Sequence, residues 1–261
     1  MRHSLREVLY RVRDPRLVMD TAIRGAMNVW DLVSPLEFSL LYRQVRPYTM
    51  CSNARLRALY LGVRHVVRQQ VPGDLVECGC AKGGSAALMA MTLRRLEAQR
   101  TVWLFDTFEG LPAPTTKDPD YEIANLYTGD CVGTLEEVKR LFQQLSVADR
   151  VQFVKGLFQD SLPTAPIPQI ALLHIDGDWY ESVKACLENL YDKVVPGGII
   201  QFDDYGYWKG ARNAVDEFFE TRGIHAPLRR LDYSGRSFIK PLPTAEIDRN
   251  QALSSKSPCA G

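Results

Sequence analysis

The sequence predicts an α/β protein with a doubly wound, mostly parallel sheet of seven strands. Short apolar runs alternate with amphipathic helical stretches from about residue 54 onward, and acids follow four of these runs. Strands that alternate with helices imply right-handed βαβ crossovers and therefore parallel pairing. The pattern ends on two strands joined by a short turn, which adds an antiparallel edge.

The expected elements follow in order along the chain. Residues 1–50 mix apolar and basic residues at helical spacing and contain helix-breaking prolines, so they predict an N-terminal helical extension. Asn53 is expected to cap the first long helix, at 54–70. Further helices are expected at 85–99, 134–145, 180–194 and 210–222. Strands are expected at 74–77, 101–106, 151–156, 169–176, 198–204, 226–232 and 237–242.

Two segments lack a regular pattern. Residues 107–133 are rich in Pro, Gly, Asp and Thr and are too long for an ordinary connection. The polar stretch 244–261 predicts a disordered tail. We therefore expect an extension over 1–50, one folded domain over 51–243 and the tail.

Composition excludes several classes of partner. The formal net charge is +1 with both signs scattered along the chain, so we expect neither nucleic acid nor a membrane surface as a partner. We find neither a signal peptide nor an apolar run long enough to span a bilayer. No CxxC pair occurs among the cysteines, which favours reduced thiols in a cytoplasmic protein over disulfides or a zinc site. The cysteines are Cys51, Cys78, Cys80, Cys131, Cys186 and Cys259.

The first two strand ends carry features of a cofactor site. In such a sheet, ligands bind beyond the carboxyl ends of the strands. Gly79 and Gly83 follow the first strand and allow a tight turn into a helix whose N-terminus presents free N–H groups. A dinucleotide fingerprint needs glycine where this chain has Ala81, so the loop alone is compatible with a plain turn. Asp106 ends the second strand, where a carboxylate can accept hydrogen bonds from ribose hydroxyls.

Two pairs of acids follow the next strands of the central pattern. Asp176 and Asp178 end one strand, and Asp203 and Asp204 end the other. Converging carboxylates would raise one another's pKa values, and a divalent cation would relieve the repulsion. Oxygen ligands favour Mg²⁺, with Mn²⁺ or Ca²⁺ as weaker candidates. Each acid could instead be a turn former, and Asp178 could cap the helix that follows.

Together these segments resemble the macrocin O-methyltransferase family of enzymes that depend on S-adenosylmethionine and a metal. These enzymes methylate hydroxyls of sugars on macrolides and other natural products. The matching segments are YTMCSNARLRAL, PGDLVECGCAKGGSAALM, LFDTFEGLP, VKGLFQDSLP, ALLHIDGDWYES and VPGGIIQFDDYGYWKGARNAVDEF. The resemblance implies a Rossmann-like class I methyltransferase fold, a homodimer, and helices of the N-terminal extension that cover the site.

The resemblance also implies roles for individual residues. It assigns Asp178 as the candidate general base, with Asp176 beside it in the catalytic set. Residue 174 is His, where the family commonly has Arg or Lys, and we expect a satisfied, half-buried side chain rather than a base. The expected metal ligands are Asp176, Asp203 and Asp204. The expected cofactor residues are Met50, Glu77, Gly79, Gly83, Ser85, Asp106, Phe158, Gln159, Asp160 and Asp176.

The expected function is Mg²⁺-dependent (or Mn²⁺-dependent) O-methylation of a hydroxylated small molecule, with 107–133 as a lid over the acceptor. A sugar on a natural product is the expected acceptor. One alternative is a glycosyltransferase that uses Asp176-Gly177-Asp178 as a DxD metal motif. The other alternative is a non-catalytic relative that binds S-adenosylmethionine.

Overall fold

The computed structural model describes residues 36–225 and 227–241. Most of the predicted N-terminal extension (1–35) and all of the predicted tail (244–261) lie outside these residues. Within them, no helix is long and apolar enough to cross a membrane.

A seven-stranded sheet with the order β3-β2-β1-β4-β5-β7-β6 forms the centre of the described chain. The first five strands pair in parallel, whereas β7 runs antiparallel to β5 and to β6. This topology confirms the predicted doubly wound sheet and its antiparallel edge. The strands are β1 (Asp74–Cys78), β2 (Val102–Asp106), β3 (Val151–Lys155), β4 (Ile170–Ile175), β5 (Val194–Phe202), β6 (Arg229–Arg230) and β7 (Arg236–Ile239).

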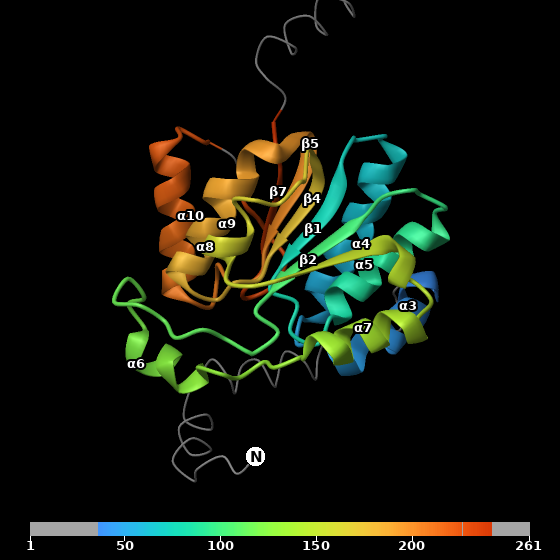
Figure 1. Cartoon of the computed structure of the whole chain (residues 1–261). Coiled ribbons are helices and arrows are strands. Elements are labelled where there is room, and N and C mark those ends of the chain that lie inside the picture. Colours follow the sequence, from blue (N-terminus) through green and yellow to red (C-terminus); the bar gives the residue numbers. More distant parts are fainter. Residues whose placement is uncertain (1–35, 226, 242–261) are drawn as a thin grey trace, which may run out of the picture.

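Helices cover both faces of the sheet (Figure 1). One face carries α3 (Leu36–Val45), α4 (Asn53–Arg68), α5 (Gly84–Arg95) and α7 (Leu135–Gln144); the other carries α8 (Phe158–Ser161), α9 (Tyr180–Leu190) and α10 (Lys209–Thr221). Because both faces are covered, all six residues of β4 are buried.

Several element boundaries differ from the sequence expectation: α9 ends at Leu190 and β5 begins at Val194, each four residues earlier than expected. The N-cap of α4 is Ser52, whose hydroxyl accepts the N–H of Arg55, and Asn53 already belongs to the helix. Ser52 occupies the N-cap position because its backbone is extended, as a capping residue requires. Helix α5 ends at Arg95, four residues early, and Glu97 beyond it has a left-handed backbone. Helix α7 begins with a capping box, in which the side chain of Thr134 accepts the N–H of Glu137 and the side chain of Glu137 accepts the N–H of Thr134.

The irregular segment 107–133 lies beside the carboxyl ends of the strands and contains α6 (Tyr121–Ala124) and the 3-10 turn η2 (Asn125–Tyr127). Its contacts with α9 and α10 are specific. Trp179 donates its indole N–H to the carbonyl of Pro112 at 2.7 Å, and the ring of Tyr127 packs edge-on against Trp208. The segment therefore borders the space above the carboxyl ends of the strands.

Candidate active site

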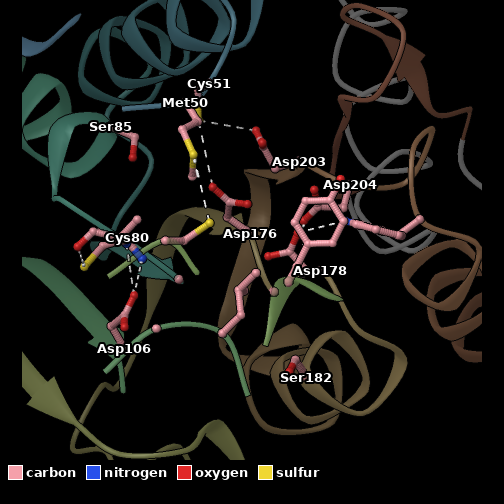
Figure 2. Close-up of a pocket in the computed structure, with 18 of the residues that line it drawn as sticks. Met50, Cys51, Cys80, Ser85, Asp106, Asp176, Asp178, Ser182, Asp203 and Asp204 are labelled. Carbon is pink, nitrogen blue, oxygen red and sulfur yellow. Dashed lines mark hydrogen bonds between the residues drawn. The ribbon is translucent and has the colours of Figure 1, made fainter. Parts of the chain in front are cut away.

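A cavity of about 410 Å³ lies where the predicted strand ends converge. Residues that follow β1, β2, β4 and β5 line it, together with the end of the α3–α4 connection and part of 107–133. Figure 2 shows Asp106 and Cys80 on one side of this space and the four acids that follow β4 and β5 on the other. The parallel register thus brings together side chains that the sequence only placed at separate strand ends.

Most of the residues expected to bind the cofactor line the cavity: Met50, Gly79, Ser85, Asp106, Phe158, Gln159 and Asp176. Three do not. Gly83 is the left-handed N-cap of α5, close to Val138 of α7, and Asp160 is exposed on α8. Glu77 is fully buried beside His174. The roles of these residues toward the cofactor stay predictions.

The turn after β1 has the shape of a ligand cradle. Gly79 has a φ of +87°, and a Cβ there would lie 1.8 Å from the carbonyl oxygen of Asp176, so only glycine fits. The Asp106 carboxylate accepts the N–H groups of Cys80 and Ala81 at 2.7 and 3.1 Å, which fixes the loop against β2. The other oxygen of Asp106 accepts the N–H of Phe108 at 2.7 Å, so of the roughly four acceptor positions of a carboxylate about one is left for a hydroxyl of a bound nucleoside.

The acids after β4 and β5 fit a hard divalent cation. Carboxylate oxygens of Asp176, Asp178 and Asp204 all lie within 4.8 Å of one another. Burial and the neighbouring carboxylates raise the pKa values of Asp176 and Asp204 well above their ordinary range. Such mutual repulsion is the electrostatic signature of a site that a cation would stabilise. All three donors are carboxylates, which is the donor set that Mg²⁺ prefers.

Asp178 is not the cap of α9. The N-cap position is Trp179, and the N–H of Tyr180 is accepted at 2.8 Å by Asp118 from segment 107–133. Asp178 instead has a left-handed backbone and accepts the indole N–H of Trp208 at 2.9 Å. Burial raises the pKa of Asp178 to about 6, against the opposing effect of the Trp208 hydrogen bond. This places its carboxylate in the range useful to a general base.

Asp203 has a buried cation as its partner. Arg55 contacts it from α4 and also lies 3.0 Å from Asp232, and the side chains of both acids are only 4% exposed. Burial favours the neutral acid, but Arg55 and His174 outweigh burial and lower the pKa of Asp203. The sequence analysis did not identify Arg55 as a site residue. Its position could have indicated a buried arginine, because it falls on the apolar stripe of α4, four residues before Leu59.

His174 is fully buried rather than half-buried, and it links Glu77 of β1 to Asp203 in the acid cluster. Its Nδ1 lies 2.7 Å from Glu77 Oε1, and its Nε2 lies 3.3 Å from Asp203 Oδ1. Burial opposes the charged form, yet the two carboxylates raise the pKa of His174 to about 9. Glu77 Oε2 is buried and has no hydrogen-bond partner among the described residues.

Comparisons with known proteins agree on one family. The sequence profile of the macrocin-O-methyltransferase (TylF) family matches residues 43–240. The chain is 39% identical over 194 residues to the demethyldecarbamoylnovobiocin O-methyltransferase of Streptomyces niveus, covering 72% of this chain and 74% of that protein. It is 37% identical over 193 residues, with the same coverage, to a Streptomyces olivaceus enzyme, 8-demethyl-8-(2,3-dimethoxy-alpha-L-rhamnosyl)-tetracenomycin-C 4'-O-methyltransferase.

Solved structures give the same result. The structure of the O-methyltransferase NovP superimposes with a TM-score of 0.70 at 37% identity, covering 75% of this chain and 83% of that chain. The calicheamicin methyltransferase CalS11 superimposes with a TM-score of 0.62 at 24% identity, covering 87% of this chain and 93% of that one, which supports the fold.

Proposed function

Because the chain belongs to the macrocin O-methyltransferase family and is an S-adenosylmethionine-dependent O-methyltransferase, we propose that it methylates a sugar hydroxyl of a glycosylated natural product with the help of a bound Mg²⁺. The observation that carries the metal-dependent part is the cluster of carboxylates from Asp176, Asp178 and Asp204 in the pocket. The family assignment leaves no support for the glycosyltransferase alternative. The acceptor class follows from the relatives, which are enzymes of antibiotic tailoring.

The chain's own residues divide the task between two sides of the cavity. On the cofactor side, we propose that Asp106 and the turn at Gly79 hold the nucleoside and methionine parts of S-adenosylmethionine. On the acid side, Asp176 and Asp204 are proposed to hold the ion, with Asp203 as the third ligand expected from the family. The positioning of both reactants in one closed pocket accounts for much of the rate enhancement in such reactions.

The chemistry supplied by the bound groups is an activated methyl on a sulfonium and a cation that lowers the pKa of the acceptor hydroxyl. The proton of that hydroxyl goes to Asp178. Trp208 holds one oxygen of its carboxylate, and the raised pKa of about 6 brings its basicity close to neutral pH. Aromatic side chains of Tyr207, Trp208 and Tyr233 line the acceptor side of the cavity and provide faces on which a sugar ring can pack.

The test is methyl transfer from S-adenosylmethionine to a panel of glycosylated acceptors, with and without a chelator. We expect turnover that a chelator abolishes and Mg²⁺ restores. Asp204→Asn is expected to lower turnover at least about 100-fold while S-adenosylmethionine still binds, because the cofactor side is untouched. Asp149→Asn, at an exposed acid far from the cavity, serves as the control.

Turnover that persists in chelator, or full activity of Asp204→Asn, would overturn the metal assignment.

We also include in the proposal the homodimer implied by the family resemblance and a cytoplasmic location. Light scattering of the purified protein tests the dimer, and a monomer at assay concentration contradicts it.

A further inference from the structure

A thiol and an imidazole lie beside the carboxylates of Asp176 and Asp203. Cys51 Sγ, from the connection before α4, lies 3.9 Å from Asp176 Oδ2 and 3.7 Å from Asp203 Oδ1. Dashed lines in Figure 2 join Cys51 to both carboxylates. His174 Nε2 lies 3.3 Å from the same oxygen of Asp203. One donor atom from each of these four residues lies within 4.8 Å of all the others.

Three separations among these donors are close to those of ligands around a small tetrahedral ion. With Zn–N and Zn–O bonds of about 2.0 Å and a Zn–S bond of about 2.3 Å, tetrahedral ligands stand about 3.3 Å apart for an N–O pair and about 3.5 Å apart for an S–O pair. The N–O pair of His174 and Asp203 has the first separation, and the S–O pairs of Cys51 exceed the second by a few tenths of an ångström. Small side-chain rotations would close that gap.

The imidazole is already oriented as a ligand. A histidine that binds a metal usually donates its other ring N–H to a carboxylate, which fixes the ring and its tautomer. Glu77 Oε1 stands 2.7 Å from Nδ1 of His174 with both side chains fully buried, so Nε2 is directed at Cys51 and the two acids. An ion that binds at Nε2 displaces the proton which this nitrogen shares with Asp203, while Glu77 keeps the proton on Nδ1.

The negative charge of the donors also favours a cation. A divalent ion with one thiolate and two carboxylates carries a net charge of −1, and Arg55, which contacts the other oxygen of Asp203 and also Asp232, places a positive charge beside them. A mixed set of sulfur, nitrogen and oxygen donors prefers Zn²⁺ or Co²⁺ to Mg²⁺. The sequence indicated no zinc site because Cys51 and His174 stand far apart along the chain; the fold brings them together.

We propose that the pocket contains a second metal site, for a borderline transition-metal ion such as Zn²⁺, whose ligands are Cys51, His174, Asp176 and Asp203. This site shares Asp176 and Asp203 with the proposed Mg²⁺ ligands and differs from them by having Cys51 and His174 in place of Asp204. Because the two sites overlap, Zn²⁺ bound here excludes Mg²⁺ and inhibits methyl transfer. The inhibition rests on the proposed Mg²⁺-dependent function, whereas the binding of Zn²⁺ does not.

The experiment uses the full-length protein, freed of metal and kept reduced, with Co²⁺ as the probe. A cobalt ion bound by a thiolate gives a sulfur-to-metal charge-transfer band in the near ultraviolet, and a tetrahedral site gives intense visible bands. We expect both spectra at one equivalent of Co²⁺ and their loss when one equivalent of Zn²⁺ displaces it. Loss of an outer-sphere partner alone costs about 10–100-fold in affinity. Cys51→Ser is therefore expected to bind Zn²⁺ at least about 100-fold more weakly and to lack the charge-transfer band.

Cys131→Ser is the matched control. Cys131 lines the same cavity, but its sulfur lies beside Met50 Sδ at 4.0 Å and outside the four-donor group. We expect it to keep the cobalt spectrum. Cys51→Ala provides a second variant in case the serine disturbs the buried site, and circular dichroism checks that each variant is folded.

The absence of a charge-transfer band in the wild-type protein would overturn the inference, as would a band that survives in folded Cys51→Ser and Cys51→Ala. A band lost in Cys131→Ser but kept in Cys51→Ser would overturn it as well. The two proposals fail in different ways. Turnover that does not depend on Mg²⁺, found together with a cobalt spectrum that depends on Cys51, contradicts the proposed Mg²⁺-dependent function but not the second metal site.

Discussion

Asp118 attaches segment 107–133 to the start of α9, and its removal should release that segment. Its carboxylate accepts the N–H of Tyr180 at 2.8 Å and the N–H of Thr115 at 2.9 Å, and only 4% of the residue is exposed. Asp118→Ala removes a helix cap worth about 0.5–2 kcal/mol and leaves the N–H of Thr115 without its charged acceptor. We estimate a total of about 1.5–3 kcal/mol, which weakens docking of the segment about ten- to a hundredfold.

The assay is limited proteolysis with chymotrypsin, because Tyr121 in this segment is 41% exposed. Cleavage after Tyr121 should accelerate by about the same factor when reclosing is faster than cleavage. Rates are normalised to those of the denatured chains. Asp118→Asn keeps one acceptor oxygen and should give an intermediate rate. Global stability, measured by urea denaturation, should fall by no more than the same 1.5–3 kcal/mol.

A second perturbation tests the same contact from α10. A Cβ added at Gly210 would lie 1.9 Å from Asp118 Oδ1, so Gly210→Ala must displace the carboxylate from the N–H of Tyr180. It should accelerate cleavage after Tyr121 as Asp118→Ala does. Unchanged cleavage rates in both folded variants would refute the conclusion that this carboxylate holds the segment in place.

Two further predictions concern the pocket itself. Arg55→Met leaves Asp203 buried without its cation and should lower the free energy of unfolding by about 3–5 kcal/mol in urea denaturation; an unchanged value contradicts a stabilising role for the ion pair. Gly79→Ala forces a Cβ against the carbonyl of Asp176 and should weaken S-adenosylmethionine binding at least about tenfold by calorimetry. Gly129→Ala is its control, because Gly129 has a similar left-handed backbone with nothing within 4 Å of the added atom; equal losses in both variants would contradict the steric argument.

The local pattern of the chain was enough to predict the sheet. Alternating apolar runs and amphipathic stretches specify strands and helices, and the handedness of βαβ crossovers leaves few ways to assemble them. Because the strands are parallel, Asp106, Asp176, Asp178, Asp203 and Asp204 were expected together at the carboxyl ends of the strands. All five line the cavity. Helix ends were less predictable, because Ser52 and Asn53 are both residue types that favour the N-cap, and the backbone conformation decided between them.

The sequence by itself therefore determined the architecture and the edge at which the acids gather, since both follow from short-range periodicity and strand direction. Only the tertiary structure decided which polar groups meet: Arg55 against Asp203, Asp118 at the start of α9, and Cys51 beside Asp176. These partners are separated by 148, 62 and 125 positions along the chain. The physical reason is that such pairings depend on how helices and loops pack over the sheet, and no local pattern of residues encodes that packing.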